Sequence, residues 1–408
     1  MPIQERLQAP SPRAADMNVR EGRAGSGLAA AVRLQRGGFS LDVALEAPAV
    51  VTALLGPSGA GKSLTLQAIA GLAPIAEGWV TLNGRALADA RARLALPPRL
   101  RRVGYVPQSY ALFPHLSVAG NIAYGLPGGM SRTDKARRVS ELLTLGRLAG
   151  YERRRPRDLS GGEAQRVAVL RALAAQPEAL LLDEPFSALD APTRAAVRGD
   201  LGALIASSGL PTILVTHDLA EALALAARLA LLVDGRIAIA GPVADALAQP
   251  PSLRAARLLG WSAALDVARC EPLGGPTSGA LVTLTCGQRL ALDGAAIATD
   301  APAQPPAALA LALRPERLLI ERIDRKDRDG ASPARDTLCG VIAVSDGDAS
   351  PARVTLDGQD GAAGATLELT LTPREQAALA SAGDLDGARV ALRPLPGALR
   401  LLPREATR

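Results

Sequence analysis

The sequence predicts an α/β fold over about residues 28–242, followed by a β-rich region. Two observations predict the first part: short apolar runs alternate with helical stretches, and one apolar run leads through a glycine-rich loop into a helix. A third observation predicts the second part. Beyond Pro250 and Pro251 the chain changes to short segments of alternating polarity, separated by Gly and Pro. The 408 residues suffice for two or three domains.

The composition limits the kinds of partner that the chain is expected to bind. The formal net charge is +6, which suits nucleic acid or an anionic membrane surface, but aromatic residues make up only 2% of the chain. Few side chains are therefore available to stack on bases, and we expect no nucleic-acid partner. The arginines within 99–102 and 153–155 are expected to be solvated surface charge.

The cysteines and the apolar runs indicate the cellular compartment in which the chain is expected to work. Cys270, Cys286 and Cys339 are too widely spaced for a metal site or a disulfide framework, so a reducing cytosol is expected. The N-terminus lacks the apolar core of a signal peptide, and no apolar run reaches transmembrane length. Work at a membrane would then need another polypeptide that spans the bilayer.

A flexible tail and two domains are expected. Residues 1–26 are rich in Pro, Arg, Gly and Ala without a period and predict a flexible tail. Residues 27–245 form the α/β domain, with buried parallel strands at 50–55, 179–182 and 212–215. Asp234 and Gly235 predict a tight hairpin between 229–233 and 237–240, because Asp-Gly favours a type I′ turn.

Residues 246–408 are expected to form a β-rich regulatory domain, as two small modules of about 258–320 and 335–402. The alternating segments that predict strands are 280–284, 289–292, 352–356, 366–371 and 389–392.

The glycine-rich loop at 56–63 matches the phosphate-binding spacing G-x-x-x-x-G-K-[ST]. Its glycines allow a tight turn whose N–H groups converge on phosphates, the Lys62 charge faces the β- and γ-phosphates, and the Ser63 hydroxyl suits Mg²⁺. The helix that follows directs its N-terminal dipole at the same anion. The expected nucleotide-binding residues are Gly56, Pro57, Ser58, Gly59, Ala60, Gly61, Lys62, Ser63 and Leu64.

An apolar strand at 180–182 ends in two adjacent carboxylates. Consecutive strand residues point to opposite sides, so Asp183 can hold Mg²⁺ while Glu184 faces an attacking water. An acidic pair alone is a weak signal of a catalytic site, but after a phosphate-binding loop it is strong.

A second helix start lies at 159–166. Ser160 and Glu163 have the spacing of a capping box, and the glycines between them leave N–H groups bare at the positive end of a helix, which suits another anion.

Together these motifs resemble the ATP-binding subunits of ABC transporters. The phosphate loop matches at 56–63, the family signature at 159–166 and the Asp-Glu strand at 180–184. Gln108 matches the glutamine loop, 187–190 the D-loop, and His217 in Thr-His-Asp the switch histidine. The resemblance covers about residues 28–242.

The resemblance implies a homodimer in which each nucleotide lies between two copies. The P-loop of one copy holds ATP and Mg²⁺, and the signature of the other closes over the γ-phosphate, through Leu159, Ser160, Gly161, Gly162 and Glu163. It implies catalytic roles for Glu184, His217 and Gln108, a D-loop at Asp190, and Mg²⁺ ligands Ser63, Gln108 and Asp183.

It also implies integral-membrane permease subunits and, indirectly, an extracytoplasmic solute-binding protein, with the chain peripheral at the cytoplasmic face of the inner membrane. His115 lies where such subunits meet their permease. Two positions depart from the family pattern. Leu64 replaces a second hydroxyl, and Phe39, the one candidate to stack on adenine, is better interpreted as a core residue.

The segment 312–317 resembles the R-P-E element of importer regulatory domains, and 82–87 with 96–106 most resembles molybdate importer ATPases, with sulfate importers next. We therefore expect an importer ATPase for an oxyanion such as molybdate or sulfate. Sugar, polyamine or iron import stays open, as does a role of the C-terminal region in sensing an oxyanion. An exporter or a soluble non-transport ATPase is a more remote alternative.

Overall fold

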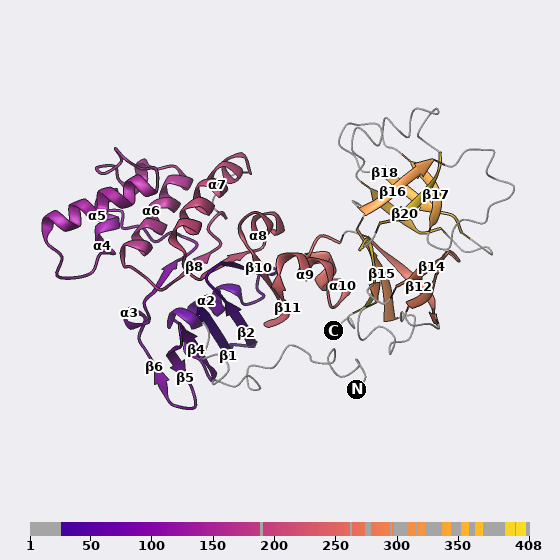
Figure 1. Ribbon diagram of the computed structural model, residues 1–408, viewed down its shortest axis with the longest axis horizontal. Coiled ribbons are helices and arrows are strands. Elements are labelled where there is room, and N and C mark those ends of the chain that lie inside the picture. Colours follow the sequence, from indigo (N-terminus) through magenta and orange to yellow (C-terminus); the bar gives the residue numbers. More distant parts are fainter. Residues whose placement is uncertain are drawn as a thin grey trace. The chain divides into compact units, whose positions relative to one another are not determined.

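The computed structural model describes residues 26–187, 191–261, 263–273, 279–293, 296–297, 308–314, 317–322, 337–343, 352–358, 364–369, 388–395 and 397–404. The chain divides into two compact units, with the division after Ala246 (Figure 1). The predicted α/β region followed by a β-rich region is confirmed. No helix among the described residues is long and apolar enough to cross a bilayer.

The first unit is built on an 11-stranded sheet of order β6-β5-β4-β1-β2-β11-β10-β3-β9-β8-β7. Its half from β10 to β7 is parallel, and it contains the three strands expected as buried: β3 (Val51–Leu55), β8 (Ala179–Asp183) and β9 (Thr212–Thr216). The remaining strands are β1 (Leu28–Arg36), β2 (Phe39–Ala47), β4 (Glu77–Leu82), β5 (Arg85–Asp89), β6 (Leu94–Ala95), β7 (Val103–Val106), β10 (Arg228–Val233) and β11 (Arg236–Pro242).

The predicted hairpin joins β10 to β11 through Asp234 and Gly235. Both turn residues have positive φ, 47° and 76°, as a type I′ turn requires. The sequence prediction of this turn is confirmed.

Two apolar cores flank the sheet. One lies between the helix after the phosphate loop, α2, and strands β1, β2 and β4. The other joins α4, α5, α6 and α7, which gather together in Figure 1. The helices are α2 (Lys62–Ala70), α3 (Pro98–Arg101), α4 (Val118–Tyr124), α5 (Arg132–Leu145), the 3₁₀ helix η2 (Pro156–Asp158), α6 (Gly161–Ala174), α7 (Ala191–Ser208), α8 (Leu219–Leu225), α9 (Val243–Ala248) and α10 (Leu253–Leu258).

Helix α2 is stabilised at its C-terminus by a buried arginine. The Arg101 guanidinium donates to the carbonyls of Ala68 (3.0 Å) and Ile69 (2.7 Å), and its Nε donates to Leu96 (2.8 Å). A cation at this end of a helix satisfies free carbonyls and opposes the helix dipole. Arg101 is only 4% exposed, so the expectation of surface charge is wrong for this residue. The three arginines at 153–155 are exposed as predicted.

The second unit contains two five-stranded sheets, β14-β13-β12-β15-β21 and β16-β20-β17-β18-β19. Its strands are β12 (Ala263–Leu273), β13 (Gly279–Leu284), β14 (Arg289–Leu292), β15 (Leu309–Leu313), β16 (Leu318–Arg322), β17 (Leu338–Ala343), β18 (Ala352–Leu356), β19 (Thr366–Leu369), β20 (Arg389–Pro394) and β21 (Leu399–Pro403). Because β16 joins the later strands and β21 returns to β15, the sheets are not two consecutive segments such as 258–320 and 335–402.

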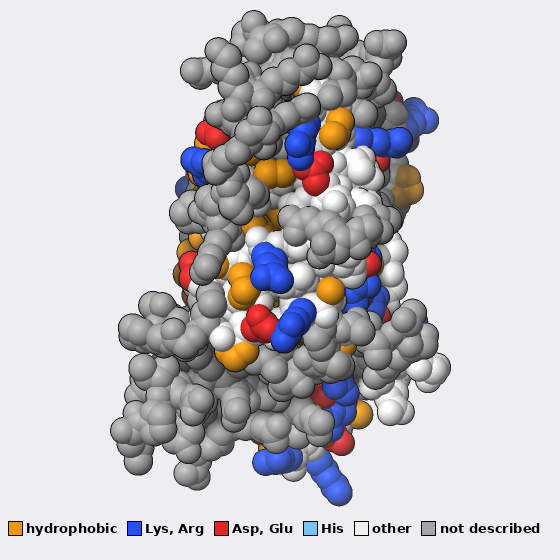
Figure 2. Space-filling view, turned by 90° about the vertical axis from the view of Figure 1, so that its right-hand side faces the viewer, with side chains coloured by type: hydrophobic (Ala, Val, Ile, Leu, Met, Phe, Trp, Pro, Cys, Tyr) orange, Lys and Arg blue, Asp and Glu red, His pale blue; other side chains and the backbone are white. Residues whose placement is uncertain are grey.

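A buried amide links the two sheets. The side chain of Gln288 accepts from the N–H of Cys339 (3.0 Å) and donates to the carbonyls of Cys339 (2.6 Å) and Asp357 (2.9 Å). On the face shown in Figure 2, the described basic and acidic side chains are interspersed rather than separated by sign. Within the second sheet, cross-strand ion pairs such as Arg353–Glu368 (3.3 Å) join opposite charges on neighbouring strands.

Replacing Arg101 with Met should lower the free energy of unfolding of the first unit by about 1–3 kcal/mol, because three backbone carbonyls lose a buried donor. Arg99→Met is the matched control: Arg99 is exposed in the same short helix, and we expect a change within about 0.5 kcal/mol. Calorimetric unfolding measures both. Equal effects of the two substitutions would contradict this account of Arg101.

Candidate functional site

The phosphate loop needs its glycines for one close contact with a neighbouring backbone and for two positive φ angles. A Cβ on Gly56 would lie 2.3 Å from the carbonyl oxygen of Leu232, and Gly59 and Gly61 have positive φ of 79° and 103°. A Cβ on Gly61 would also meet the Phe39 ring at 3.0 Å. Phe39 therefore packs beneath the loop, in agreement with its interpretation as a core residue.

Lys62 is buried beneath this loop, and its ammonium group has three polar partners. It is 5% exposed, and its Nζ donates to the carbonyls of Gly56 (2.9 Å) and Pro57 (3.0 Å). Its third partner is the carboxylate of Glu184, with 3.6 Å between Nζ and Oε1. The ammonium thus connects the loop before α2 to the carboxylate that follows β8.

Asp183 is held through both carboxylate oxygens. Ser63 Oγ donates to Oδ1 (2.8 Å), and the hydroxyl of Tyr105 donates to Oδ2 (3.1 Å). Burial raises the pKa of Asp183, against the lowering effect of these two hydrogen bonds. Burial, followed by the Asp183 charge, also raises the pKa of the Tyr105 phenol, which therefore stays a hydrogen-bond donor.

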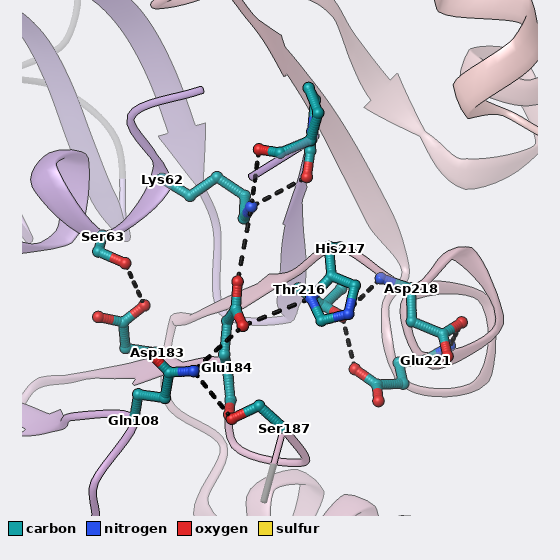
Figure 3. Close-up of polar contacts among 12 residues, drawn as sticks. Lys62, Ser63, Gln108, Asp183, Glu184, Ser187, Thr216, His217, Asp218 and Glu221 are labelled. Carbon is teal, nitrogen blue, oxygen red and sulfur yellow. Dashed lines mark hydrogen bonds and ion pairs between the residues drawn. The ribbon is translucent and has the colours of Figure 1, made fainter. Parts of the chain in front are cut away.

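The carboxylate of Glu184 lies between Lys62, Gln108 and His217, which come from three other segments of the chain (Figure 3). Besides Lys62, its carboxylate contacts His217 Nδ1 (3.4 Å) and Gln108 Nε2 (3.5 Å). Its backbone has a positive φ of 43°, rare for a residue with a Cβ. The carbonyl of Glu184 accepts from Ser187 Oγ (2.9 Å), so the turn after β8 fixes the unusual backbone.

His217 follows β9 and precedes a capped helix. Asp218 caps α8, where its Oδ1 accepts from the N–H of Ala220 (2.7 Å). The Thr216 hydroxyl donates to Glu221 (2.5 Å), whose pKa is raised by burial. Arg194 of α7 lies 3.7 Å from Asp218 and 3.8 Å from Glu221. These contacts fix the residues that precede and follow His217 in the sequence. The side chain of His217 itself is 52% exposed.

The oxygen donors in this cluster suit Mg²⁺. Ser63 offers a hydroxyl, Asp183 a carboxylate and Gln108 an amide oxygen, and hard oxygen ligands are those that Mg²⁺ prefers. An open cavity of about 530 Å³ is lined by all three side chains. Among the described residues, no group of three or more His, Cys, Asp and Glu could hold a metal.

The signature segment forms a separate cluster at the start of α6. Ser160 and Glu163 make the predicted capping box: the Ser160 N–H donates to Glu163 Oε2 (2.7 Å), and the Glu163 N–H donates to Ser160 Oγ (3.4 Å). Burial opposes ionisation of Glu163, but hydrogen bonds from Ser160 and Tyr151 outweigh it and lower its pKa.

Gly162 has a steric role that the motif did not reveal. It is buried, and a Cβ there would lie 2.4 Å from Cγ2 of Val197 in α7. The sequence predicted only that this glycine leaves an N–H group bare. In the structure it also lets α6 and α7 pack closely.

Some predicted residues lie apart from the cluster. The Leu64 side chain is 8% exposed and belongs to the apolar core, and the hydroxyl of Thr65 donates to the Gly61 carbonyl (2.9 Å). Asp190 lies outside the described residues. His115 is exposed, and its ring lies 5.9 Å from that of Phe113.

Sequence reasoning missed Tyr105 and Glu221 as residues of the site. Each is close in sequence to a predicted residue, which is the only signal that could have found them. Ser187 was predicted only as part of the D-loop, and in the structure it also contacts Gln108 and the Glu184 carbonyl.

The chain is similar in sequence to known proteins. Residues 41–187 match the family model described as ABC transporter. The chain is 47% identical to an Fe(3+) ions import ATP-binding protein of Pseudomonas fluorescens and 45% identical to a molybdenum import ATP-binding protein of Paramagnetospirillum magneticum, over 54% and 55% of this chain. Each match covers 61% of the relative's length.

A longer match reaches the second unit. The chain is 38% identical over 310 residues to an Fe(3+) ions import ATP-binding protein of Mesorhizobium japonicum, which spans 76% of this chain and 79% of that protein.

Gly162→Ala should destabilise the first unit by about 1–3 kcal/mol, because the new Cβ displaces Val197. Val197→Ala opens the space, so the double variant should lose less stability than the sum of the two single variants. Thermal unfolding of all three variants measures this coupling. Strict additivity would show that Gly162 does not limit the approach of α6 and α7.

Proposed function

We propose that this chain, which belongs to the ABC transporter family of ATP-binding proteins, hydrolyses ATP to drive import of a small solute through a separate membrane partner. The contact of Glu184 with both Lys62 and His217 carries the proposal. It joins a phosphate-binding lysine, a carboxylate able to accept a proton and a histidine in one cluster.

Glu184 would align and deprotonate the water that attacks the γ-phosphate. It is half-buried and fixed through its own backbone, which suits a general base. Lys62 would leave the loop carbonyls and Glu184 for the phosphates, and its charge would stabilise negative charge in the transition state. His217, at the end of β9, would donate to the γ-phosphate.

Mg²⁺ would be held by Ser63, Asp183 and Gln108, and would neutralise charge on the β- and γ-phosphates. Gln108 is exposed and also contacts Glu184 and Ser187. This position suits a residue that reports occupancy of the site to a partner, as the family resemblance implies.

A second copy of the chain would complete each site. Ser160, Gly161 and Gly162 lie at the N-terminus of a 14-residue helix, whose first N–H groups have no partner within the helix. Supplied by a partner copy, these groups would bind the γ-phosphate. The functional form would then be a homodimer that closes on ATP and opens after hydrolysis. Asp190 would line the same dimer interface.

The membrane partner would meet the surface around His115. The ring of Phe113 packs at a tilt against that of Tyr124, with 4.5 Å between the ring centres, and Tyr124 is 67% exposed. Arg171 lies 5.3 Å from the Phe113 ring. Exposed aromatic side chains with an arginine are typical of binding surfaces. The chain would thus act as a peripheral subunit at the cytoplasmic face of the membrane, with an extracytoplasmic binding protein delivering the solute.

Molybdate and ferric iron are the two proposed cargoes. The resemblance of 82–87 and 96–106 to molybdate importer ATPases favours the first, as does the molybdenum import relative. The iron import relatives, one of which matches across 76% of this chain, favour the second equally.

Glu184→Gln should retain ATP binding and lower the rate of hydrolysis by about 10²–10⁴-fold, because the amide cannot accept the proton of water. Phosphate release measures the rate, and equilibrium binding of ATP is the control. A wild-type rate in this variant would overturn the assignment of Glu184.

A mixing experiment tests the shared site. Lys62→Ala damages the P-loop side and Ser160→Arg the signature side, so each variant alone should be inactive. An equal mixture should recover about a quarter of the wild-type rate, since half of the dimers are mixed and each has one intact site. No recovery in a mixture shown to form mixed dimers would contradict the two-copy site.

Cargo is tested by uptake into vesicles that carry the chain with its membrane partner. ATP-dependent accumulation of molybdate without ferric iron, or the reverse, would select one cargo. Accumulation of neither, with sulfate, sugar or polyamine accepted instead, would reject both.

A further inference from the structure

Tyr105 hydrogen-bonds one of the proposed Mg²⁺ ligands, Asp183. It lies on β7, opposite Leu181 of the neighbouring parallel strand β8. From there its hydroxyl reaches Oδ2 of Asp183 at 3.1 Å, just beyond Leu182. The phenol is thus aimed at the carboxylate by strand pairing rather than by a flexible loop.

The other carboxylate oxygen faces the phosphate loop. Ser63 Oγ lies 2.8 Å from Asp183 Oδ1, so two of the oxygen atoms proposed to bind Mg²⁺ already converge. The hydroxyl of Tyr105 occupies only Oδ2 and leaves Oδ1 to Ser63. Binding of an ion between Ser63 and Oδ1 would therefore not require Asp183 to lose its bond to Tyr105.

The helix of the phosphate loop lies at the same cavity as the phenol. Gln67 follows Ser63 by four residues and hence lies on the same face of α2. Gln67, Tyr105 and Asp183 line the same open cavity as Ser63 and Gln108. The contacts run from Ser63 on α2 through Asp183 at the end of β8 to Tyr105 on β7.

We propose that Tyr105 is a positioning residue for the metal: it fixes the carboxylate of Asp183 so that Oδ1 and the Ser63 hydroxyl present a ready pair of ligands. This inference rests on the proposed function, because the ion it concerns is the one that accompanies ATP. Partners that orient a metal ligand contribute about 10–100-fold to metal affinity. Tyr105 itself touches neither ion nor phosphate.

The test removes one oxygen atom. Tyr105→Phe keeps the ring, which packs on the apolar core, and deletes only the hydroxyl. Tyr110→Phe is the matched control, because Tyr110 is a buried tyrosine whose hydroxyl donates to the Pro185 carbonyl (3.0 Å), away from Asp183. Mn²⁺ is the spectroscopic probe, titrated onto each variant with a non-hydrolysable ATP analogue bound.

Tyr105→Phe should raise the Mn²⁺ dissociation constant about 10–100-fold, with metal-free binding of the analogue unchanged and the hydrolysis rate restored at saturating Mg²⁺. Tyr110→Phe should change neither constant. An unchanged Mn²⁺ constant in Tyr105→Phe would overturn the proposal, as would a hydrolysis rate that saturating Mg²⁺ does not restore. Failure of the proposed function is separate: the wild-type chain itself would then show no ATP hydrolysis.

Discussion

The end of strand β8 is the constraint on which the site depends. Because Asp183 and Glu184 are consecutive, their side chains diverge, one toward Ser63 and Tyr105 and the other toward Lys62 and His217. The strained backbone of Glu184 directs the second carboxylate. The contacts of the two carboxylates with Ser63, Lys62 and His217 require β3, β9 and β8 to be adjacent and parallel, since the loops that follow them then meet at one edge.

Local patterns of the sequence predicted much of this. The buried strands, the Asp234-Gly235 turn and the capping box at Ser160 each depend on residues within a few positions of one another, so spacing alone identifies them. The motif residues Lys62, Ser63, Gln108, Asp183, Glu184 and His217 do lie together.

The rest depended on contacts between distant segments. The bond between Tyr105 and Asp183 joins residues 78 apart, and Arg101 is buried only because it reaches the end of a helix 32 to 33 residues earlier. No periodic pattern in the sequence indicates either contact, and the arginines of an arginine-rich run are usually solvated. The pairings of β16 and of β21 in the second unit were not predicted for the same reason. Alternating polarity identifies a strand, but it does not identify the strand with which it pairs.

The pairing of β15 with β21 has a consequence for synthesis of the chain on the ribosome. The sheet of the first unit is complete once residue 242 has emerged, whereas the first sheet of the second unit lacks its edge strand until residues 399–403 follow. Domains generally fold as they emerge, and pairing of distant strands is slow. The catalytic unit can therefore fold first, while β15 keeps an unpaired edge open to aggregation for the time needed to translate the intervening residues.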